Sequence, residues 1–317
     1  MGELVRVQNV TRDFHVSGAR LRALDGVSFD VKEGETLGIV GESGCGKSTL
    51  ARLIVGVDRP TQGEIRLGGV SVQASDGASR RRLARFCQMI FQDPYSSLNP
   101  RLRVEDIVAE PLVIHQVGSG RDRAAEVRRL LERVGLPRDA GRRFPHEFSG
   151  GQRQRIGIAR ALALKPRVLV ADEPVSALDV SIQAQVLNLL ADLRDELGLT
   201  LLLVSHDLQV IQWMADRVIV MYLGRVMEWG PRADVFERPA HPYTQALLNS
   251  APRLYPEDRL PDEVLLSGDV PSALNPPSGC PFHPRCFQRE DRCAEESPPT
   301  QTLGDSWVTA CVKPSSI

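Results

Sequence analysis

A run of eight residues in the first fifth of the chain has the composition and spacing of a phosphate-binding loop. It reads Gly41-Glu42-Ser43-Gly44-Cys45-Gly46-Lys47-Ser48 and matches the pattern G-x-x-x-x-G-K-[ST]. Glycines let backbone N–H groups curl around phosphate oxygens, and a helix start adds the positive end of its dipole. We expect Lys47 to reach the β- and γ-phosphates and the Ser48 hydroxyl to bind Mg²⁺. The expected contacts to the nucleotide are Gly41, Ser43, Gly44, Cys45, Gly46, Lys47, Ser48 and Thr49.

Two adjacent carboxylates form a second candidate for chemistry. Asp172 and Glu173 end an apolar run within the segment VLVADEP. A carboxylate at the end of a buried strand costs several kcal/mol unless a cation or hydrogen bonds compensate it. Coupled to a phosphate loop, this pair predicts that Asp172 lies on the Mg²⁺ side and that Glu173 acts as the base on the attacking water.

The patterns around these motifs predict an α/β fold with a mainly parallel sheet. Short strands are expected at Leu4–Val7, Val27–Val31, Leu37–Val40, Glu64–Leu67, Val168–Ala171 and Leu201–Val204, and helices at Ala124–Val134, Gln152–Leu164 and Ile182–Leu197. The strand signal is missing from about 93 to 165, which predicts an inserted helical subdomain. After about residue 240, proline and cysteine become frequent, and we expect a separate appendage with little regular structure.

Bulk composition narrows the classes of function. The 317 residues are 42% apolar and 25% charged, with a net charge of −1, so the chain lacks the basic excess typical of nucleic-acid-binding proteins. The N-terminus has no apolar core of a secretory signal, and the longest apolar stretch, near Leu197–Val204, is far shorter than the roughly 20 residues of a membrane span. A role at a membrane would therefore require docking onto other chains.

The segment Phe148-Ser149-Gly150-Gly151-Gln152 resembles the L-S-G-G-Q signature of ABC transporter ATP-binding subunits. Phenylalanine stands in place of the common leucine, and Ser149 occupies a helix N-cap position. The resemblance implies a P-loop NTPase (RecA-like) ABC cassette. It also implies that Ser149, Gly150, Gly151 and Gln152 cover the γ-phosphate held by a partner subunit, so that hydrolysis requires a dimer.

Other family motifs follow in the same order along the chain. Gln92 resembles the Q-loop glutamine that senses Mg²⁺ and water, and Asp179 lies in a segment that resembles the D-loop. His206 resembles the switch histidine at the γ-phosphate. Phe14 is placed like the aromatic residue that stacks on adenine, although His15 or a neighbour could serve instead. Glu173 and His206 together imply that this chain hydrolyses ATP.

The sequence beyond the cassette resembles the oligopeptide, dipeptide and nickel import family. The similar segments are HPYTQALL from His241, GCPFHPRC from Gly279 and FQDPYSSLNPR from Phe91. They imply import of short peptides, with nickel chelates or glutathione as alternative substrates. A non-transport ATPase that acts on nucleic acid or ribosomes is a more remote alternative. The implied domains are a nucleotide-binding domain at 1–240 and an extension at 241–317.

The implied partners follow from the same family. They are a second cassette (a heterodimer is favoured over a homodimer), two transmembrane permeases and an extracytoplasmic solute-binding protein, with no nucleic acid. The chain would then lie at the cytoplasmic face of the cell membrane, held there through the permeases.

Four cysteines lie in the last part of the chain, at Cys280, Cys286, Cys293 and Cys311, with the spacing C-x₅-C-x₆-C-x₁₇-C. This spacing lacks the tight pairs of structural zinc sites and matches no ferredoxin run, so from spacing alone it indicates only that a four-thiolate site is feasible. The family resemblance implies a [4Fe–4S] cluster. Zinc, with His283 as a further ligand, and plain reduced cysteines are the alternatives.

Overall fold

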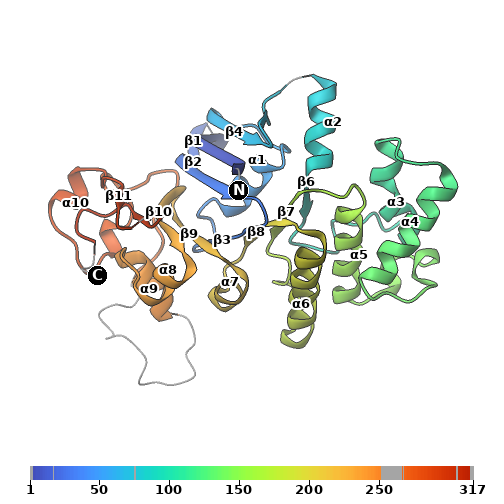
Figure 1. Cartoon of the computed structure of the whole chain (residues 1–317). Helices are drawn as coiled ribbons and strands as arrows, with labels where there is room; N and C mark the ends of the chain where they lie inside the picture. Colours follow the sequence, from blue (N-terminus) through green and yellow to red (C-terminus); the bar gives the residue numbers. More distant parts are fainter. Residues whose placement is uncertain are drawn as a thin grey trace.

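The computed structural model describes residues 3–16, 18–74, 76–250, 266, 268–304 and 306–314 (Figure 1). The first of its two sheets is antiparallel, with the strand order β2-β1-β4-β5. These strands are β1 (Glu3–Val16), β2 (Ala19–Lys32), β4 (Gln62–Leu67) and β5 (Val70–Ser71).

Strands β1 and β2 correct the sequence prediction. The short strands expected at Leu4–Val7 and Val27–Val31 are parts of two 14-residue strands that form one hairpin. The pairing register shifts after Val7 and again after Val10. Because each shift interrupts the alternation of buried and exposed side chains, the sequence pattern did not reveal the outer half of the hairpin.

The second sheet is mixed and has the strand order β11-β12-β10-β9-β3-β8-β7-β6. Its parallel strands are β6 (Cys87–Ile90), β7 (Val168–Asp172), β8 (Thr200–Val204), β3 (Thr36–Val40) and β9 (Arg217–Tyr222). The apolar runs of β3, β7 and β8 are fully buried, as predicted for parallel strands covered on both faces. The residues that follow β3, β7 and β8 therefore meet at one edge of the sheet.

Helices pack around this sheet. Those that directly follow or flank its strands are α1 (Lys47–Ile54), α2 (Gly77–Phe86), α6 (Val180–Leu197), α7 (Leu208–Met214) and α8 (Arg232–Glu237). Strand β10 (Arg225–Pro231) returns antiparallel to β9.

Between β6 and β7 the described chain forms helices and no strand. They are α3 (Val104–Ile114), α4 (Gly120–Arg133), the 3₁₀ turns η1 (Ala140–Arg142) and η2 (Pro145–Glu147), and α5 (Gly150–Leu162). Helices α3 and α4 lie farthest from the two sheets, at the right of Figure 1. Helices α4 and α5 begin earlier than the periodicity predicted because Ser119 and Ser149 cap them with their side chains.

The C-terminal part is more regular and more closely attached than predicted. It contains α9 (Pro242–Ser250), η5 (His283–Arg285), α10 (Arg292–Glu295), β11 (Gln301–Thr302) and β12 (Val308–Thr309); residues 251–265 lie outside the described chain. Strand β12 pairs with β10 and so extends the cassette sheet. Phe282 and Trp307 are buried in the same core cluster as the parallel strands. The expectation of a separate appendage is therefore wrong, since this segment completes both a sheet and a core.

Candidate nucleotide-binding site

The phosphate loop lies between β3 and α1, where the sequence placed it. Gly46 is the N-cap of α1 with φ of 107°, and a Cβ at this position would lie 2.5 Å from the Ala23 carbonyl oxygen. Only glycine fits this backbone without strain. The buried Lys47 Nζ donates to the carbonyl oxygens of Gly41 at 2.7 Å and Glu42 at 3.0 Å. The ammonium group is thus held inside the curl of the loop.

The predicted carboxylate pair divides into two environments. Asp172 ends β7 and accepts a hydrogen bond of 3.1 Å from Ser48 Oγ. Burial raises the pKa of Asp172, and the bond from Ser48 partly opposes that effect. A buried carboxylate beside a hydroxyl is a donor set that suits Mg²⁺ at the phosphate loop. These two residues therefore fit the predicted metal position.

Glu173 faces a different set of partners. Its carboxylate Oε2 accepts from Gln92 Nε2 at 2.8 Å and lies 3.3 Å from His206 Nδ1. Its φ of 46° is in the left-handed region, which costs a non-glycine residue about 1–3 kcal/mol and is concentrated at functional sites. The turn after β7 thus directs Asp172 toward Ser48 and Glu173 toward Gln92 and His206. The structure brings together all three predicted catalytic residues.

A cavity of about 300 Å³ lies in front of the phosphate loop. Its lining includes the predicted residues Phe14, Ser43, Gly44, Gly46, Lys47, Ser48, Thr49, Gln92 and Glu173. The Arg12 guanidinium lies 4.5 Å from the centroid of the Phe14 ring.

Sequence reasoning missed six residues of the cavity wall, namely Leu21, Arg22, Ala23, Leu223, Gly224 and Ala273. The first three lie on β2, where Leu21 pairs with Phe14 across the hairpin. Recognising the full length of the hairpin would have found them. Ala273 comes from the C-terminal part, and no sequence signal pointed to it.

The signature segment lies away from this cavity lining. Ser149 is exposed and caps α5 through a capping box, in which its Oγ accepts from Gln152 N–H at 3.4 Å. Gly151 permits close helix packing, because a Cβ there would lie 2.3 Å from Ile182 Cγ2 on α6. Gly150 approaches Leu178, which directly precedes Asp179, the N-cap of α6. The signature and the predicted D-loop are therefore neighbours.

Two arginines of α5 connect the signature helix to the segment after Gln92. Arg160 Nη1 donates to the Ser97 carbonyl oxygen at 2.6 Å. The Arg153 guanidinium lies 4.1 Å from the centroid of the Tyr95 ring. Because of these contacts, a displacement of the segment after Gln92 would also displace α5, the helix that carries the signature.

The four C-terminal cysteines are free and lie in one neighbourhood. The backbone N–H of Cys280 donates to the Cys293 carbonyl oxygen at 2.8 Å. Burial raises the pKa of Cys280 to about 11 and of Cys286 to about 12, and Cys293 and Cys311 add to both shifts. Within the described residues, however, no group of three or more His, Cys, Asp or Glu side chains is arranged to hold a metal ion. The cysteines as placed do not fit the expected cluster.

Comparison with known proteins decides the family. The family model described as "ABC transporter" matches residues 24–176, and the model "Oligopeptide/dipeptide transporter, C-terminal region" matches residues 227–293. The chain is 49% identical over 292 residues to the dipeptide transport ATP-binding protein DppF of Haemophilus influenzae, covering 92% of this chain and 89% of the relative. This chain belongs to the ABC transporter family.

Further relatives agree with this assignment. The di/tripeptide transport ATP-binding protein DppF of Pseudomonas aeruginosa is 48% identical, covering 98% of this chain and 95% of the relative. Among solved structures, the dimeric ATP-binding cassette MJ0796 bound to ADP and Pi matches with a TM-score of 0.66 and 32% identity, over 72% of this chain and 98% of that one. The cassette cbiO1 from Clostridium perfringens matches with a TM-score of 0.66 and 28% identity, over 75% of this chain and 92% of that one.

Membership confirms the predicted fold class, a P-loop NTPase ABC cassette, and the predicted enzyme class. The chain is an ABC transporter ATPase that uses ATP with Mg²⁺. None of the helices in the described part is long and apolar enough to cross a membrane.

Proposed function

We propose that this ABC ATPase powers the uptake of short peptides. The observation that carries the proposal is the match of residues 227–293 to the C-terminal region of oligopeptide/dipeptide transporters. Relatives named for dipeptide and di/tripeptide transport cover nearly the whole chain and support it. Nickel chelates and glutathione are the alternative substrates on the same architecture, and a non-transport ATPase acting on nucleic acid or ribosomes has the least support.

In this proposal the residues at the sheet edge divide the work of hydrolysis. Lys47 and the loop N–H groups bind the phosphates, and Ser48, Asp172 and Gln92 hold Mg²⁺, which when bound neutralises developing negative charge. Glu173 takes the proton of the attacking water.

Two further side chains orient this base. The contacts of 2.8 Å to Gln92 and 3.3 Å to His206 would fix the Glu173 carboxylate toward the γ-phosphate. Phe14 is proposed to stack on adenine because it lines the same cavity.

The signature is proposed to act on the nucleotide of a second cassette. Ser149 to Gln152 are absent from the lining of this chain's own cavity, and Asp179 lies beside them at the start of α6. A dimer would place each signature over the partner's γ-phosphate. We favour a heterodimer, with a homodimer as the alternative.

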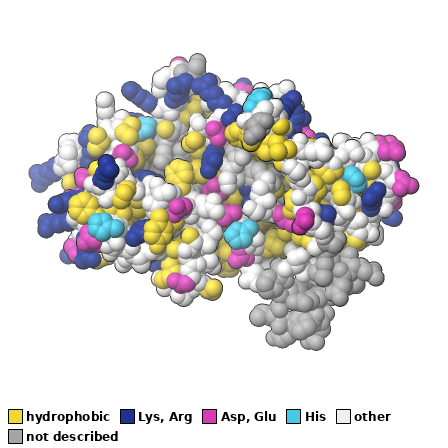
Figure 2. All heavy atoms as spheres, turned by 180° about the vertical axis from the view of Figure 1, so that it is seen from behind, with side chains coloured by type: hydrophobic (Ala, Val, Ile, Leu, Met, Phe, Trp, Pro, Cys, Tyr) yellow, Lys and Arg dark blue, Asp and Glu magenta, His cyan; other side chains and the backbone are white. Residues whose placement is uncertain are grey.

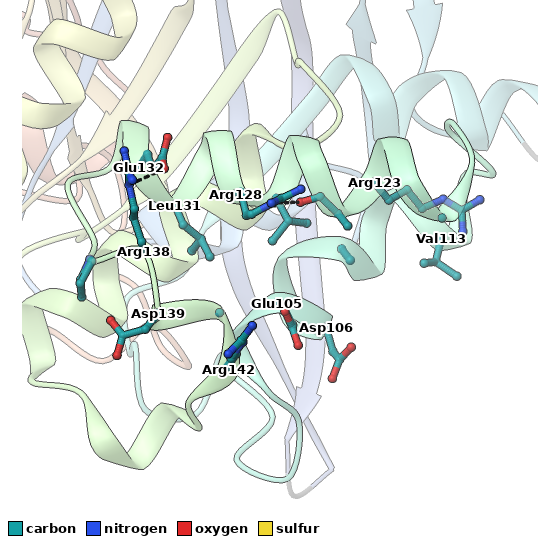
Figure 3. Close-up of a pocket in the computed structure, with 16 residues that line it drawn as sticks. Glu105, Asp106, Val113, Arg123, Arg128, Leu131, Glu132, Arg138, Asp139 and Arg142 are labelled. Carbon is teal, nitrogen blue, oxygen red and sulfur yellow. Dashed lines mark hydrogen bonds and ion pairs between the residues drawn. The ribbon is translucent and has the colours of Figure 1, made fainter.

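A groove on the helical segment is a candidate docking site for a permease. It has a volume of about 950 Å³ and lies between α3 and α4, with Ala109, Val113, Val127 and Leu131 among its apolar lining. Figure 3 shows charged side chains around it, with Glu105 and Asp106 on α3 and Arg128 and Glu132 on α4. Yellow and dark blue side chains mix over this end of the molecule in Figure 2.

The proposed occupant of this groove is a short amphipathic cytoplasmic segment of a permease, because a mixed apolar and charged surface complements such a segment. Val113 is 52% exposed at the groove, so Val113→Asp should abolish permease recovery without changing ATP affinity. Val57→Asp is the control, since Val57 is also largely exposed but does not line the groove. Retained permease binding in Val113→Asp would contradict the docking site.

The remaining assignments complete the proposal. The chain would act at the cytoplasmic face of the cell membrane with two permeases and an extracytoplasmic solute-binding protein. We propose residues 1–240, with the helical subdomain at about 93–165, as the nucleotide-binding domain and 241–317 as the extension.

One experiment tests the transport proposal as a whole. Tagged Glu173→Gln protein is captured with ATP from its native membranes in gentle detergent, and retained proteins are identified by mass spectrometry. Two multi-span permeases, a second cassette and a peptide-binding protein are expected. Recovery of ribosomal or DNA-bound partners, with no membrane protein, would overturn the transport role. Recovery of the permeases together with a nickel- or glutathione-binding protein would overturn only the proposed peptide substrate.

For the cysteines we propose a [4Fe–4S] cluster, with zinc as the alternative. The support is that the backbone N–H of Cys280 donates to the Cys293 carbonyl oxygen at 2.8 Å, and that Cys293 and Cys311 lie close enough to help raise the pKa of both Cys280 and Cys286. Loading would require these segments to rearrange, because the described side chains do not form a metal site as placed. Anaerobic purification with iron, sulfide and zinc analysis tests this, and protein free of all three would contradict it.

A further inference from the structure

A side chain from the C-terminal extension reaches the phosphate loop. The Arg285 guanidinium forms a bidentate ion pair with Glu42, the second residue of the loop, with Nη1–Oε2 at 2.7 Å and Nη2–Oε1 at 3.1 Å. Arg285 is only 8% exposed, and its Nη1 also donates to the Tyr222 hydroxyl at 3.3 Å. Bidentate, charge-assisted pairs shielded from water are among the strongest polar contacts in proteins.

The backbone of the same loop residue is held from the extension as well. The N–H of Glu42 donates to the Tyr243 hydroxyl at 3.0 Å, and Tyr243 is fully buried on α9. The rings of Tyr222, Tyr243 and Phe282 form one cluster, with centroids 4.7 to 5.4 Å apart. This cluster fixes the position of the Tyr243 hydroxyl under the loop.

The third polar group of Glu42 contacts the phosphate-binding lysine. Its carbonyl oxygen accepts from Lys47 Nζ at 3.0 Å. Glu42 is therefore held by Arg285 through its carboxylate and by Tyr243 through its N–H, while its carbonyl orients the phosphate-binding lysine. A change at either extension contact would turn the peptide groups that shape the loop.

We propose that Arg285 and Tyr243 are positioning residues for the phosphate loop, so that the C-terminal extension is a working part of the nucleotide site. The wall of the cavity agrees with this, because Ala273 of the extension lines it together with the loop. The inference rests on the proposed nucleotide site. Arg285 ends the turn η5 and immediately precedes Cys286. The backbone therefore joins the cysteines of the extension to the residue that contacts Glu42.

The test measures ATP affinity and the hydrolysis parameters of the full-length chain. Arg285→Met keeps the aliphatic stem and removes the charge, and Glu42→Gln removes the opposite charge. Each should raise the Kd and KM for ATP about tenfold, with kcat little changed, because the loop would be less well formed before binding. The double variant should be no weaker than either single variant, because the pair acts as a unit.

Controls distinguish a role of Arg285 in positioning the phosphate loop from a role only in anchoring the C-terminal extension. Arg292→Met removes an exposed ion pair to Glu290 in the same region and should leave the Kd for ATP unchanged. If Arg285→Met lowers the melting temperature but leaves the Kd for ATP unchanged, Arg285 only anchors the extension and the proposal is overturned. Arg285→Lys, which keeps the charge but not the bidentate fork, covers the case in which Arg285→Met fails to fold; it should give an intermediate Kd.

Lys47→Ala distinguishes this inference from the site on which it depends. Lost ATP binding in Lys47→Ala together with wild-type affinity in Arg285→Met would overturn the role of Arg285 alone. Unchanged affinity in Lys47→Ala would overturn the phosphate-loop assignment itself.

Discussion

The two glycine-rich helix starts of this chain are built differently. Helix α1 begins after Gly46, which has no side chain to cap it, so N–H groups of the first turn remain available to phosphate oxygens. Helix α5 begins after Ser149, whose hydroxyl already accepts the Gln152 N–H in a capping box. The start of α1 can therefore bind an anion through its N–H groups, whereas the start of α5 is capped by its own serine and needs no anion.

Their surroundings differ in the same sense. Lys47 is buried and Ser48 is bonded to Asp172, so α1 faces a site assembled from several strands of its own chain. Ser149 is exposed, and the glycines that follow it, Gly150 and Gly151, approach Leu178 and Ile182 near the start of α6. One copy of the chain therefore holds one complete phosphate site and one outward-facing half-site, and the proposed dimer would pair that half-site with the nucleotide of a second cassette.

The strongest loss of activity is predicted for Glu173 at the complete phosphate site. Glu173→Gln keeps the size of the side chain but removes the base, so the ATPase rate should fall about 10²–10⁴-fold while ATP still binds. Steady-state phosphate release and equilibrium ATP binding measure the two quantities. Glu196→Gln, which alters an exposed ion pair with Arg133, should hydrolyse ATP normally. A near-normal rate in Glu173→Gln would remove Glu173 as the base.

A smaller effect is expected at the outward-facing half. Ser149→Ala should lower the ATPase rate about tenfold or more, because its proposed contact with the γ-phosphate of a partner subunit is lost, but should leave ATP affinity of the isolated chain unchanged. Ser119→Ala is a matched control, because Ser119 caps α4 with the same capping box.

Both serine variants should lose about 1 kcal/mol of helix-cap stabilisation, which thermal unfolding measures. Equal ATPase rates in the two variants would mean that Ser149 is only a cap. The comparison between the two helix starts would then lose its functional meaning.

The smallest effect is expected at the residue that is proposed to stack on adenine. Phe14→Ala should raise the Kd for ATP about tenfold, because base stacking on an aromatic ring contributes about 1–3 kcal/mol. Phe14→Tyr should bind normally, and His15→Ala should have little effect if Phe14 is the stacking residue. A loss of affinity in His15→Ala alone would move the adenine contact to that neighbour. Fluorescent nucleotide titration measures all three.

Short motifs predicted most of the candidate site because their chemistry depends on local spacing. The phosphate loop, the pair Asp172 and Glu173, and the N-cap at Ser149 each need only a few consecutive residues, and the structure places them as that spacing required. Apolar runs likewise predicted the buried parallel strands, because such strands are covered on both faces.

The missed features all depend on pairing between distant segments. The register shifts in β1 hid a long hairpin, and with it the cavity residues near Ala23. The pairing of β12 with β10 could not be read from two residues of strand. The family resemblance implied a metal cluster at the four cysteines, yet the described side chains do not converge on a metal site.

The family, the phosphate loop and the order of the motifs could be predicted from short runs of neighbouring residues, because residue type and spacing set their chemistry. The contacts of Glu173 with Gln92 and His206, and of Arg285 with Glu42, arise only when the whole chain is folded. Such contacts depend on the packing of the whole sheet and its extension, and no local pattern encodes which distant charge a side chain will face.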